Sequence, residues 1–246
     1  MEHDERVEAA ERELGALLRA VGDDDLRVAV PTCPGWTVLD LAHHVGEFLG
    51  FWAHVLCEGT GREKTDHAPP PDADVTPAWL SAAGADMVDQ LRHTPAATPV
   101  WTWFEPDQTA GFVARRIASE LAIHRYDAQS ARGTCTPIDA ALAIEGIDET
   151  LEALVTTRPR TGVPTGQTMH LHGTDEGLAP GLGAEWLVTL LPDRIDVTRT
   201  HAKGDLALRG AVSDLELLLY NRPPLGPIES FGDASVIDLW YGEFVF

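Results

Sequence analysis

The chain has 246 residues, of which 44% are hydrophobic and 23% are charged, so its composition is that of a folded globular protein and argues against a disordered chain. Its 39 acidic residues outnumber its 18 Lys and Arg, and the formal net charge is −21. Such a surface repels nucleic-acid phosphates and anionic lipid heads, so we expect neither a nucleic-acid nor a membrane partner. An acidic substrate would need a local positive charge, from a metal or an arginine.

The cysteines and the N-terminal segment bear on the compartment. Cys33, Cys57 and Cys135 are widely spaced and form no C-x-x-C pair, which favours a reducing compartment without a disulfide framework. The first residues are charged and lack the apolar core of a signal peptide. No run of about 18 apolar residues is present, so we expect a cytoplasmic protein without a transmembrane helix.

Apolar residues at helical spacing predict four helices in the first half of the chain. These helices cover about residues 7–21, 38–59, 77–94 and 111–131, and a Pro- and Asp-rich loop covers about residues 65–74. Thr37 is a candidate N-cap, with Asp40 three residues later as in a capping box. Four helices of this length predict an antiparallel four-helix bundle.

The second half combines one more helix with short strands. The helix starts at Thr136 and Pro137, and after about residue 164 the apolar period changes toward two. The predicted strands cover residues 169–172, 184–190, 194–198, 206–209 and 236–246, with a short helix capped by Ser213 before the last of them. We therefore predict the α+β class, with a helical domain over residues 1–134 and a small α+β domain over residues 135–246.

Two adjacent histidines on the second helix have different helical phases. His43 lies in phase with Asp40 and Glu47 and is predicted to be a solvated residue. His44 lies in phase with Leu41 and the other apolar residues, so it faces the core. A histidine there is either hydrogen-bonded in the core or a ligand.

The fourth helix carries a second pair of candidate ligands. Glu120 and His124 are four residues apart and therefore project from the same face one turn apart. They lie in phase with the apolar residues Val113 and Ile117, whereas the solvated face is predicted to consist of Arg115, Arg116, Ser119 and Arg125. A buried carboxylate is costly unless it is paired or bound to a metal.

Two imidazoles and one carboxylate suit a first-row divalent metal, with zinc as the first candidate and nickel, iron or manganese as others. Three protein ligands leave positions open for water or a substrate, as in a catalytic site. The spacing alone leaves a surface Glu–His pair as the alternative.

Two segments resemble a known family. Residues 31–44 have the sequence PTCPGWTVLDLAHH and residues 120–128 have the sequence ELAIHRYDA. Both resemble helical signatures of the actinobacterial mycothiol-dependent maleylpyruvate isomerase family, whose N-terminal domain is a DinB-like bundle. The resemblance implies that His44, Glu120 and His124 hold a metal at the open end of this bundle.

The resemblance extends to the C-terminal half. Residues 204–215, GDLALRGAVSDL, and the following Tyr220, Asn221 and Arg222 resemble the sterol-carrier-protein-like domain of the same family. It implies that Arg222 faces the metal as a catalytic residue, where it could pair with a carboxylate. The alternative is an arginine that only faces the end of a helix.

The activity implied by the resemblance uses a thiol. Mycothiol would be the low-molecular-weight thiol cosubstrate, and a small electrophile such as an unsaturated keto acid would be the substrate of an isomerase or transferase. A metal-dependent hydrolase on the same scaffold and a non-catalytic binding or regulatory protein are the alternatives, because a fold alone does not decide function. A monomer and a homodimer are both compatible with the sequence.

Several other residues have alternatives that the sequence leaves open. Asp127 could orient a ligand histidine or be solvated at the helix end. His170 and His172 alternate on one face of a predicted strand, which favours a half-exposed strand over a second metal site. Cys33 is predicted to be a buried, inert thiol. Four tryptophans are candidates for either a pocket or the core: Trp36, Trp52, Trp101 and Trp103.

Overall fold

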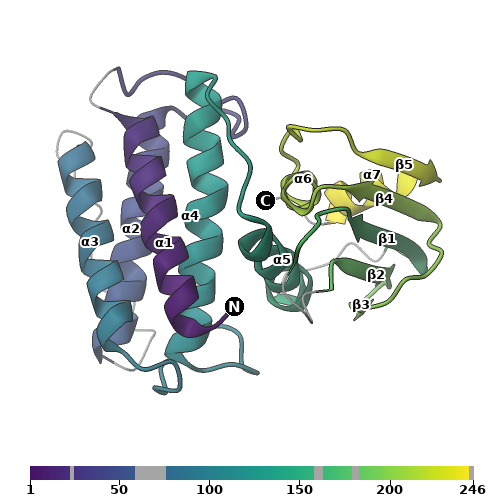
Figure 1. The fold of residues 1–246 in the computed structure, drawn as a ribbon, viewed down its shortest axis with the longest axis horizontal. Coiled ribbons are helices and arrows are strands. Elements are labelled where there is room, and N and C mark those ends of the chain that lie inside the picture. The colour runs from purple at the N-terminus through teal and green to yellow at the C-terminus, as the bar shows by residue number, and fades with distance from the viewer. Residues whose placement is uncertain (23–24, 59–75, 158–162, 179–182, 244–246) are drawn as a thin grey trace. The chain divides into compact units, whose positions relative to one another are not determined.

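A computed structural model describes residues 1–22, 25–58, 76–157, 163–178 and 183–243 of the chain. The chain divides into two compact units, which we call unit 1 (residues 1–136) and unit 2 (residues 137–246). Unit 1 is helical and unit 2 combines a sheet with helices, so the α+β prediction is confirmed (Figure 1). Within the described ranges, no helix combines the length and the apolar character needed to cross a membrane.

Unit 1 is built from four long helices that run side by side (Figure 1). They are α1 (His3–Val21), α2 (Val38–Glu58), α3 (Pro77–His93) and α4 (Ala110–Arg132). Helix α1 packs against α3 and α4, and α2 packs against the same two helices. The predicted loop over about residues 65–74 lies outside the described residues.

The ends of these helices follow from local sequence signals. The Thr76 side chain accepts a hydrogen bond from the backbone N–H of Trp79, and Pro77 occupies the first turn of α3, where its missing N–H costs nothing. The Thr109 side chain caps α4 by accepting from the N–H of Phe112. Gly133 ends α4 in the left-handed conformation, with φ of 67°, which a residue with a Cβ rarely adopts.

Unit 2 starts with α5 and continues into a five-stranded sheet. Its elements are α5 (Ala140–Glu149), a π-helical turn η2 (Thr150–Leu154), a 3-10 turn η3 (Val155–Thr157), β1 (Gln167–Gly173), β2 (Glu185–Leu190), β3 (Ile195–Thr198), β4 (Leu206–Gly210), α6 (Val212–Leu219), β5 (Glu229–Gly232) and α7 (Ser235–Glu243). The strand order is β3-β2-β1-β4-β5. Strands β1 and β4 are parallel, and the other neighbours are antiparallel.

The two faces of this sheet differ in chemistry. Met169 and Leu171 of β1 are fully buried, and α6 and α7 pack against this strand. The neighbouring Trp186 of β2 is also fully buried, and its indole donates a hydrogen bond of 2.7 Å to Asp148 of α5. Because side chains alternate along a strand, the intervening residues of β1, His170 and His172, lie on the opposite face.

Three predictions for unit 2 were wrong, and one strand was missed. The fifth helix begins at Ala140 and not at Thr136, because Asp139 accepts hydrogen bonds from the first turn and is the N-cap. Ser213 lies inside α6, where its hydroxyl accepts a bond from the N–H of Ile138. The described part of the predicted strand 236–246 is helix α7, with Val236 and Trp240 buried one turn apart. Strand β5 was missed because all four of its side chains are exposed and show no alternation.

Candidate metal centre

Helices α2 and α4 bring His44, Glu120 and His124 together. The Nε2 atom of His44 lies 3.3 Å from Oε1 of Glu120, and Nε2 of His124 lies 3.2 Å from the same oxygen. One ligand atom from each of the three residues lies within 4.8 Å of the others. We call these three residues the unit 1 cluster. Two ligand atoms on a tetrahedral zinc ion are separated by about 3.4 Å, which matches both pairs.

The faces of α2 and α4 that the sequence predicted to be buried are buried in the structure. Leu41 and Val45 of α2 are fully buried, and His44 lies beside them at the edge of the same face. On α4, Val113 and Ile117 are fully buried, and Glu120 and His124 continue their stripe. The predicted ligands therefore project from the core faces of two neighbouring helices.

The turn before α2 places Trp36 against both imidazoles. Pro34 and Gly35 form the corner of this turn, which is closed by a hydrogen bond from the N–H of Trp36 to the carbonyl of Cys33. Gly35 has φ of 86°, the conformation that the third position of a type II turn requires. The Trp36 ring lies 5.1 Å from the ring of His44 and 6.5 Å from that of His124.

The start of α2 is held by the predicted capping box. The backbone N–H of Thr37 donates to the carboxylate of Asp40 at 2.7 Å, and the N–H of Asp40 donates to the Thr37 hydroxyl at 3.3 Å. The bonds from Thr37 lower the pKa of Asp40. This box fixes the helical phase of α2 and, through it, the direction of His44.

Arg116 holds the other oxygen of Glu120. Arg116 lies one turn before Glu120 on α4, and its guanidinium pairs with Oε2 of Glu120. This pairing leaves Oε1 directed at the two imidazoles. The prediction that Arg116, Ser119 and Arg125 form a solvated face was wrong, because all three are buried. Arg125 is buried against Glu13, whose carboxylate accepts its Nε–H at 2.8 Å. Both arginines are paired with carboxylates inside the helical unit. The order of residue types along α4 does not reveal this pairing.

Asp127 orients His124 from the side away from Glu120. Its Oδ2 atom lies 3.0 Å from Nδ1 of His124 and accepts a hydrogen bond from the Cys33 thiol at 3.3 Å. Asp127 is fully buried, so it is not the solvated helix-end residue of the alternative prediction. With a proton on Nδ1, the lone pair of His124 is on Nε2, where a metal could bind. Cys33 is buried, as predicted.

His44 is the most accessible member of the cluster, with 40% of its side chain exposed. Its pKa is lowered to about 4, mainly by burial and in addition by the neighbouring His124 and Arg116. Its imidazole is therefore neutral near pH 7 and has a lone pair to offer. His43, next to it, is half-buried and lies 3.6 Å from Glu47.

The donor set fits a first-row divalent cation. Each of the three facing atoms carries a lone pair, and two neutral imidazoles with one carboxylate are ligands that zinc and its neighbours accept. The residues around them hold the ligands in place without occupying the facing atoms, since Arg116 takes Oε2 and Asp127 takes Nδ1. The sequence indicated the three donors but not the role of Arg116.

The structure also describes the surroundings of Arg222 and of two of the predicted tryptophans, each within its own unit. Arg222 lies in unit 2, where it is buried and its Nη1 donates to the carbonyl of Tyr220 just after α6. Of the four tryptophans, Trp36 lies at the unit 1 cluster, whereas Trp52 is buried beside Phe51 and Trp101. In the sequence, only the position of Trp36 in the turn just before the histidine-bearing helix α2 distinguishes it from the other predicted tryptophans.

The protein is thus of the α+β class. Its helical unit carries two histidines and a glutamate on neighbouring helices, and a unit with a sheet and helices follows. The model of the family described as "Mycothiol maleylpyruvate isomerase N-terminal domain" matches residues 7–129, and the chain belongs to this family. A search of curated proteins gives no match.

Solved structures support the same fold. A crystal structure of the mycothiol-dependent maleylpyruvate isomerase is similar, with a TM-score of 0.58 and 16% identity, and the match covers 94% of this chain and 93% of that chain. A structure of a histidine-to-alanine mutant under the same name has a TM-score of 0.59 and 15% identity over the same shares. At this identity the likeness concerns the fold, which extends over both units.

Proposed function

We propose that this protein is a metal-dependent isomerase or transferase that uses mycothiol as its thiol cosubstrate and acts on a small electrophile. The observation that carries the proposal is the convergence of Nε2 of His44, Oε1 of Glu120 and Nε2 of His124. Membership of the mycothiol maleylpyruvate isomerase family supports the thiol and the reaction class.

The residues of the unit 1 cluster have separate tasks in this proposal. His44 is neutral near pH 7 because its pKa is lowered to about 4, so it is ready to act as a ligand. Asp127 fixes the ring of His124, and Arg116 fixes the carboxylate of Glu120. A divalent cation held by these three ligands would lower the pKa of a bound thiol or water and so supply a nucleophile near neutral pH.

The negative net charge of the protein implies that a site for an acidic substrate must contain positive charge of its own. With a net charge of −21, the surface repels an acidic substrate at long range, so positive charge must act locally. We propose that Arg222 meets the carboxylate of such a substrate, since a guanidinium can bind a carboxylate through two parallel hydrogen bonds.

The test measures metal content and thiol-dependent turnover in the same preparations. Elemental analysis of the purified full chain should find about one equivalent of metal less in His44→Ala and in His124→Ala than in wild type. His43→Ala is the matched control, because it removes the adjacent imidazole of the same helix and should leave metal content unchanged. Equal metal in all four proteins would overturn the proposed centre.

Turnover distinguishes the proposed activity from its alternatives. Isomerisation of maleylpyruvate should require added mycothiol and should be lost in His44→Ala and His124→Ala. Hydrolysis of small esters or amides without thiol would instead identify a hydrolase. If wild type turns over neither kind of substrate, with or without mycothiol, the result would indicate a binding or regulatory protein.

A further inference from the structure

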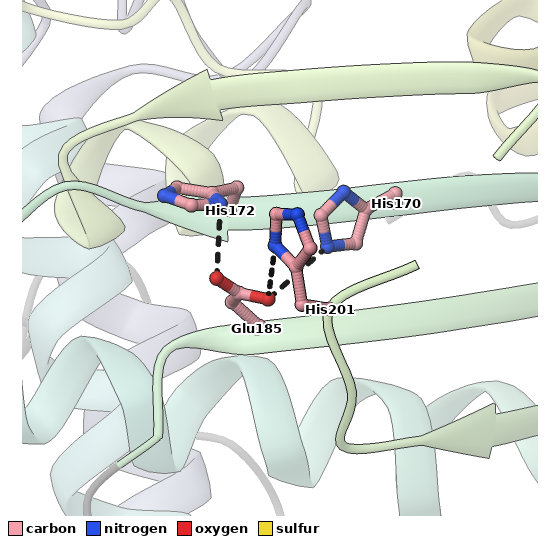
Figure 2. Close-up of side chains that lie close together, drawn as sticks. All are labelled: His170, His172, Glu185 and His201. Carbon is pink, nitrogen blue, oxygen red and sulfur yellow. Dashed lines mark hydrogen bonds and ion pairs between the residues drawn. The ribbon is translucent and has the colours of Figure 1, made fainter. Parts of the chain in front are cut away.

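A second group of potential ligands lies on the sheet of unit 2. It consists of His170, His172, Glu185 and His201, and we call it the unit 2 cluster (Figure 2). One ligand atom from each of these four residues lies within 4.8 Å of the others. Figure 2 shows the three imidazoles around the carboxylate of Glu185.

Strand geometry explains why these residues meet. His170 and His172 are two positions apart on β1, so both project from the same face of the sheet. Glu185, at the start of β2, is the direct cross-strand partner of His172. His201 comes from the segment that follows β3 and completes the cluster. The sequence pattern placed the two histidines of β1 on one face. It could not predict that Glu185 and His201 lie beside them, because this depends on strand pairing.

The Glu185 carboxylate lies at the centre of the cluster. Its Oε1 atom lies 3.0 Å from Nδ1 of His172, and its Oε2 atom lies 2.9 Å from Nδ1 of His201 and 3.6 Å from Nε2 of His170. The ring centroids of the three histidines are 5.4–6.0 Å apart. The ring planes are inclined to one another by 80–89°, so the rings do not stack.

Hydrogen bonding within the cluster leaves one buried nitrogen unsatisfied. His170 is only 5% exposed, and its Nε2 atom has no hydrogen-bond partner. The carboxylate oxygens of Glu185 are close enough to bond His172 and His201, but the contact of 3.6 Å to His170 is too long for a hydrogen bond. A buried polar atom without a partner is unfavourable, and a cation at this point would satisfy it.

A basic residue on the neighbouring strand is paired away from the cluster. Arg209 of β4 lies beside His172 in the parallel register, but its guanidinium pairs with Glu229 on β5 at 2.7 Å. That arginine is therefore engaged with a carboxylate outside the cluster.

We propose that the unit 2 cluster is a second metal site, which binds a first-row divalent cation, with Zn²⁺ as the first candidate. Three imidazoles and one carboxylate supply four protein ligands, which is the number that a closed tetrahedral zinc site uses. The ion would join β1, β2 and the segment after β3 and would have a structural role. This site is independent of the proposed function, because none of its ligands belongs to the unit 1 cluster.

The experiment isolates the second site by removing the first. The full chain carrying both His44→Ala and His124→Ala is freed of metal and titrated with Zn²⁺ in a calorimeter. We expect one equivalent to bind to this double variant. Adding His201→Ala to it should weaken Zn²⁺ binding by at least about tenfold, because one ligand is lost.

The control variant is matched to His201 in exposure and pairing. The side chain of His93 is 76% exposed and lies 3.4 Å from Asp89, whereas that of His201 is 77% exposed and lies 2.9 Å from Glu185. In the same double variant, His93→Ala should leave Zn²⁺ affinity unchanged. Because both histidines are exposed, neither substitution is expected to unfold the chain, and circular dichroism checks this.

The outcomes for the two metal sites can be distinguished. No stoichiometric binding to the double variant, or equal affinity with and without His201→Ala, would overturn the second site. Two equivalents in wild type and one in the double variant would support both sites, whereas one in each would support the second site and contradict the first. Cu²⁺ bound to the double variant should also show imidazole nitrogen couplings in its electron paramagnetic resonance spectrum, and an oxygen-only environment would contradict the proposal.

Discussion

Asp127 and His124 are joined by a contact of 3.0 Å between Oδ2 and Nδ1 that is buried inside the helical unit. The same oxygen accepts the Cys33 thiol at 3.3 Å, so the carboxylate is held from a second direction. This arrangement assigns the Nδ1 proton of His124 and directs its Nε2 lone pair toward Glu120. Groups that orient a ligand in this way typically change metal affinity when they are replaced.

Asp127→Asn should therefore weaken metal binding at the unit 1 cluster by about 10–100-fold while the protein remains folded. An amide has nearly the same shape as the carboxylate, but it has no negative charge and only one accepting oxygen, so it holds the Nδ1–H of His124 less strongly. Calorimetric titration with Zn²⁺ measures the affinity, and thermal unfolding checks the fold. Asp89→Asn, on the exposed face of α3, is the control. Unchanged affinity in Asp127→Asn would contradict the orienting role.

The sequence predicted that the candidate ligands in unit 1 lie on core faces, because helical phase is a local property. Once Leu41 faces the core, His44 must lie near it, and Glu120 must share a face with His124. The solvated face of α4 could not be predicted in the same way. Arg125 is buried because it meets Glu13, a residue more than a hundred positions earlier, and no local pattern contains that information.

In unit 2 the limits of local patterns are clearer. The short apolar segment that forms α7 is compatible with either a helix or a strand when only its sequence is considered. It is a helix because tertiary packing buries Val236 and Trp240, which lie one turn apart. Strand β5 is exposed along its whole length, so it shows no apolar period. His170 and His172 were visible as a pair, but their joint meaning depends on Glu185 and His201, which only strand pairing brings to them.

Arg116→Met tests the buried pair with Glu120. In the metal-free protein, the variant leaves a carboxylate that is only 13% exposed without its cation, which should lower the free energy of unfolding by about 3–5 kcal/mol. Excess Zn²⁺ should reduce this loss, since a divalent cation would replace the missing positive charge. Urea unfolding with EDTA and with Zn²⁺ measures both values. The same loss under both conditions would indicate that Glu120 does not bind the metal.

Glu13→Gln separates stability from metal binding. Arg125 is 2% exposed in its side chain and depends on Glu13 for an ion pair at 2.8 Å. Removing the negative charge leaves a buried guanidinium underpaired, so the free energy of unfolding should fall by about 3 kcal/mol. Glu13 is not part of the unit 1 cluster, so metal content by elemental analysis should equal that of wild type. Loss of metal in this variant would show that the cluster depends on the packing of α1.

The lowered pKa of His44 predicts a pH dependence of stability in the metal-free protein. Its pKa is about 4 in the folded chain and about 6.5 when unfolded, so the unfolded state binds a proton first as the pH falls. The stabilisation from the neutral imidazole is complete above about pH 6.5 and is lost progressively toward pH 4. Urea unfolding in EDTA at several pH values in this window should show a steeper decline for wild type than for His44→Gln. Parallel curves for the two proteins would contradict the lowered pKa.

Arg222 is the proposed partner of a substrate carboxylate, and its buried bond to the Tyr220 carbonyl offers a structural role as the alternative. A substrate-binding role predicts that Arg222→Gln raises KM for an acidic substrate by tenfold or more, because a charged hydrogen bond of about 1.5–3 kcal/mol is lost. The methyl ester of the same substrate should be affected much less, since it has no carboxylate to bind. Metal content should not change. If Arg222 only closes the end of α6, the melting temperature falls and both substrates lose activity in equal proportion.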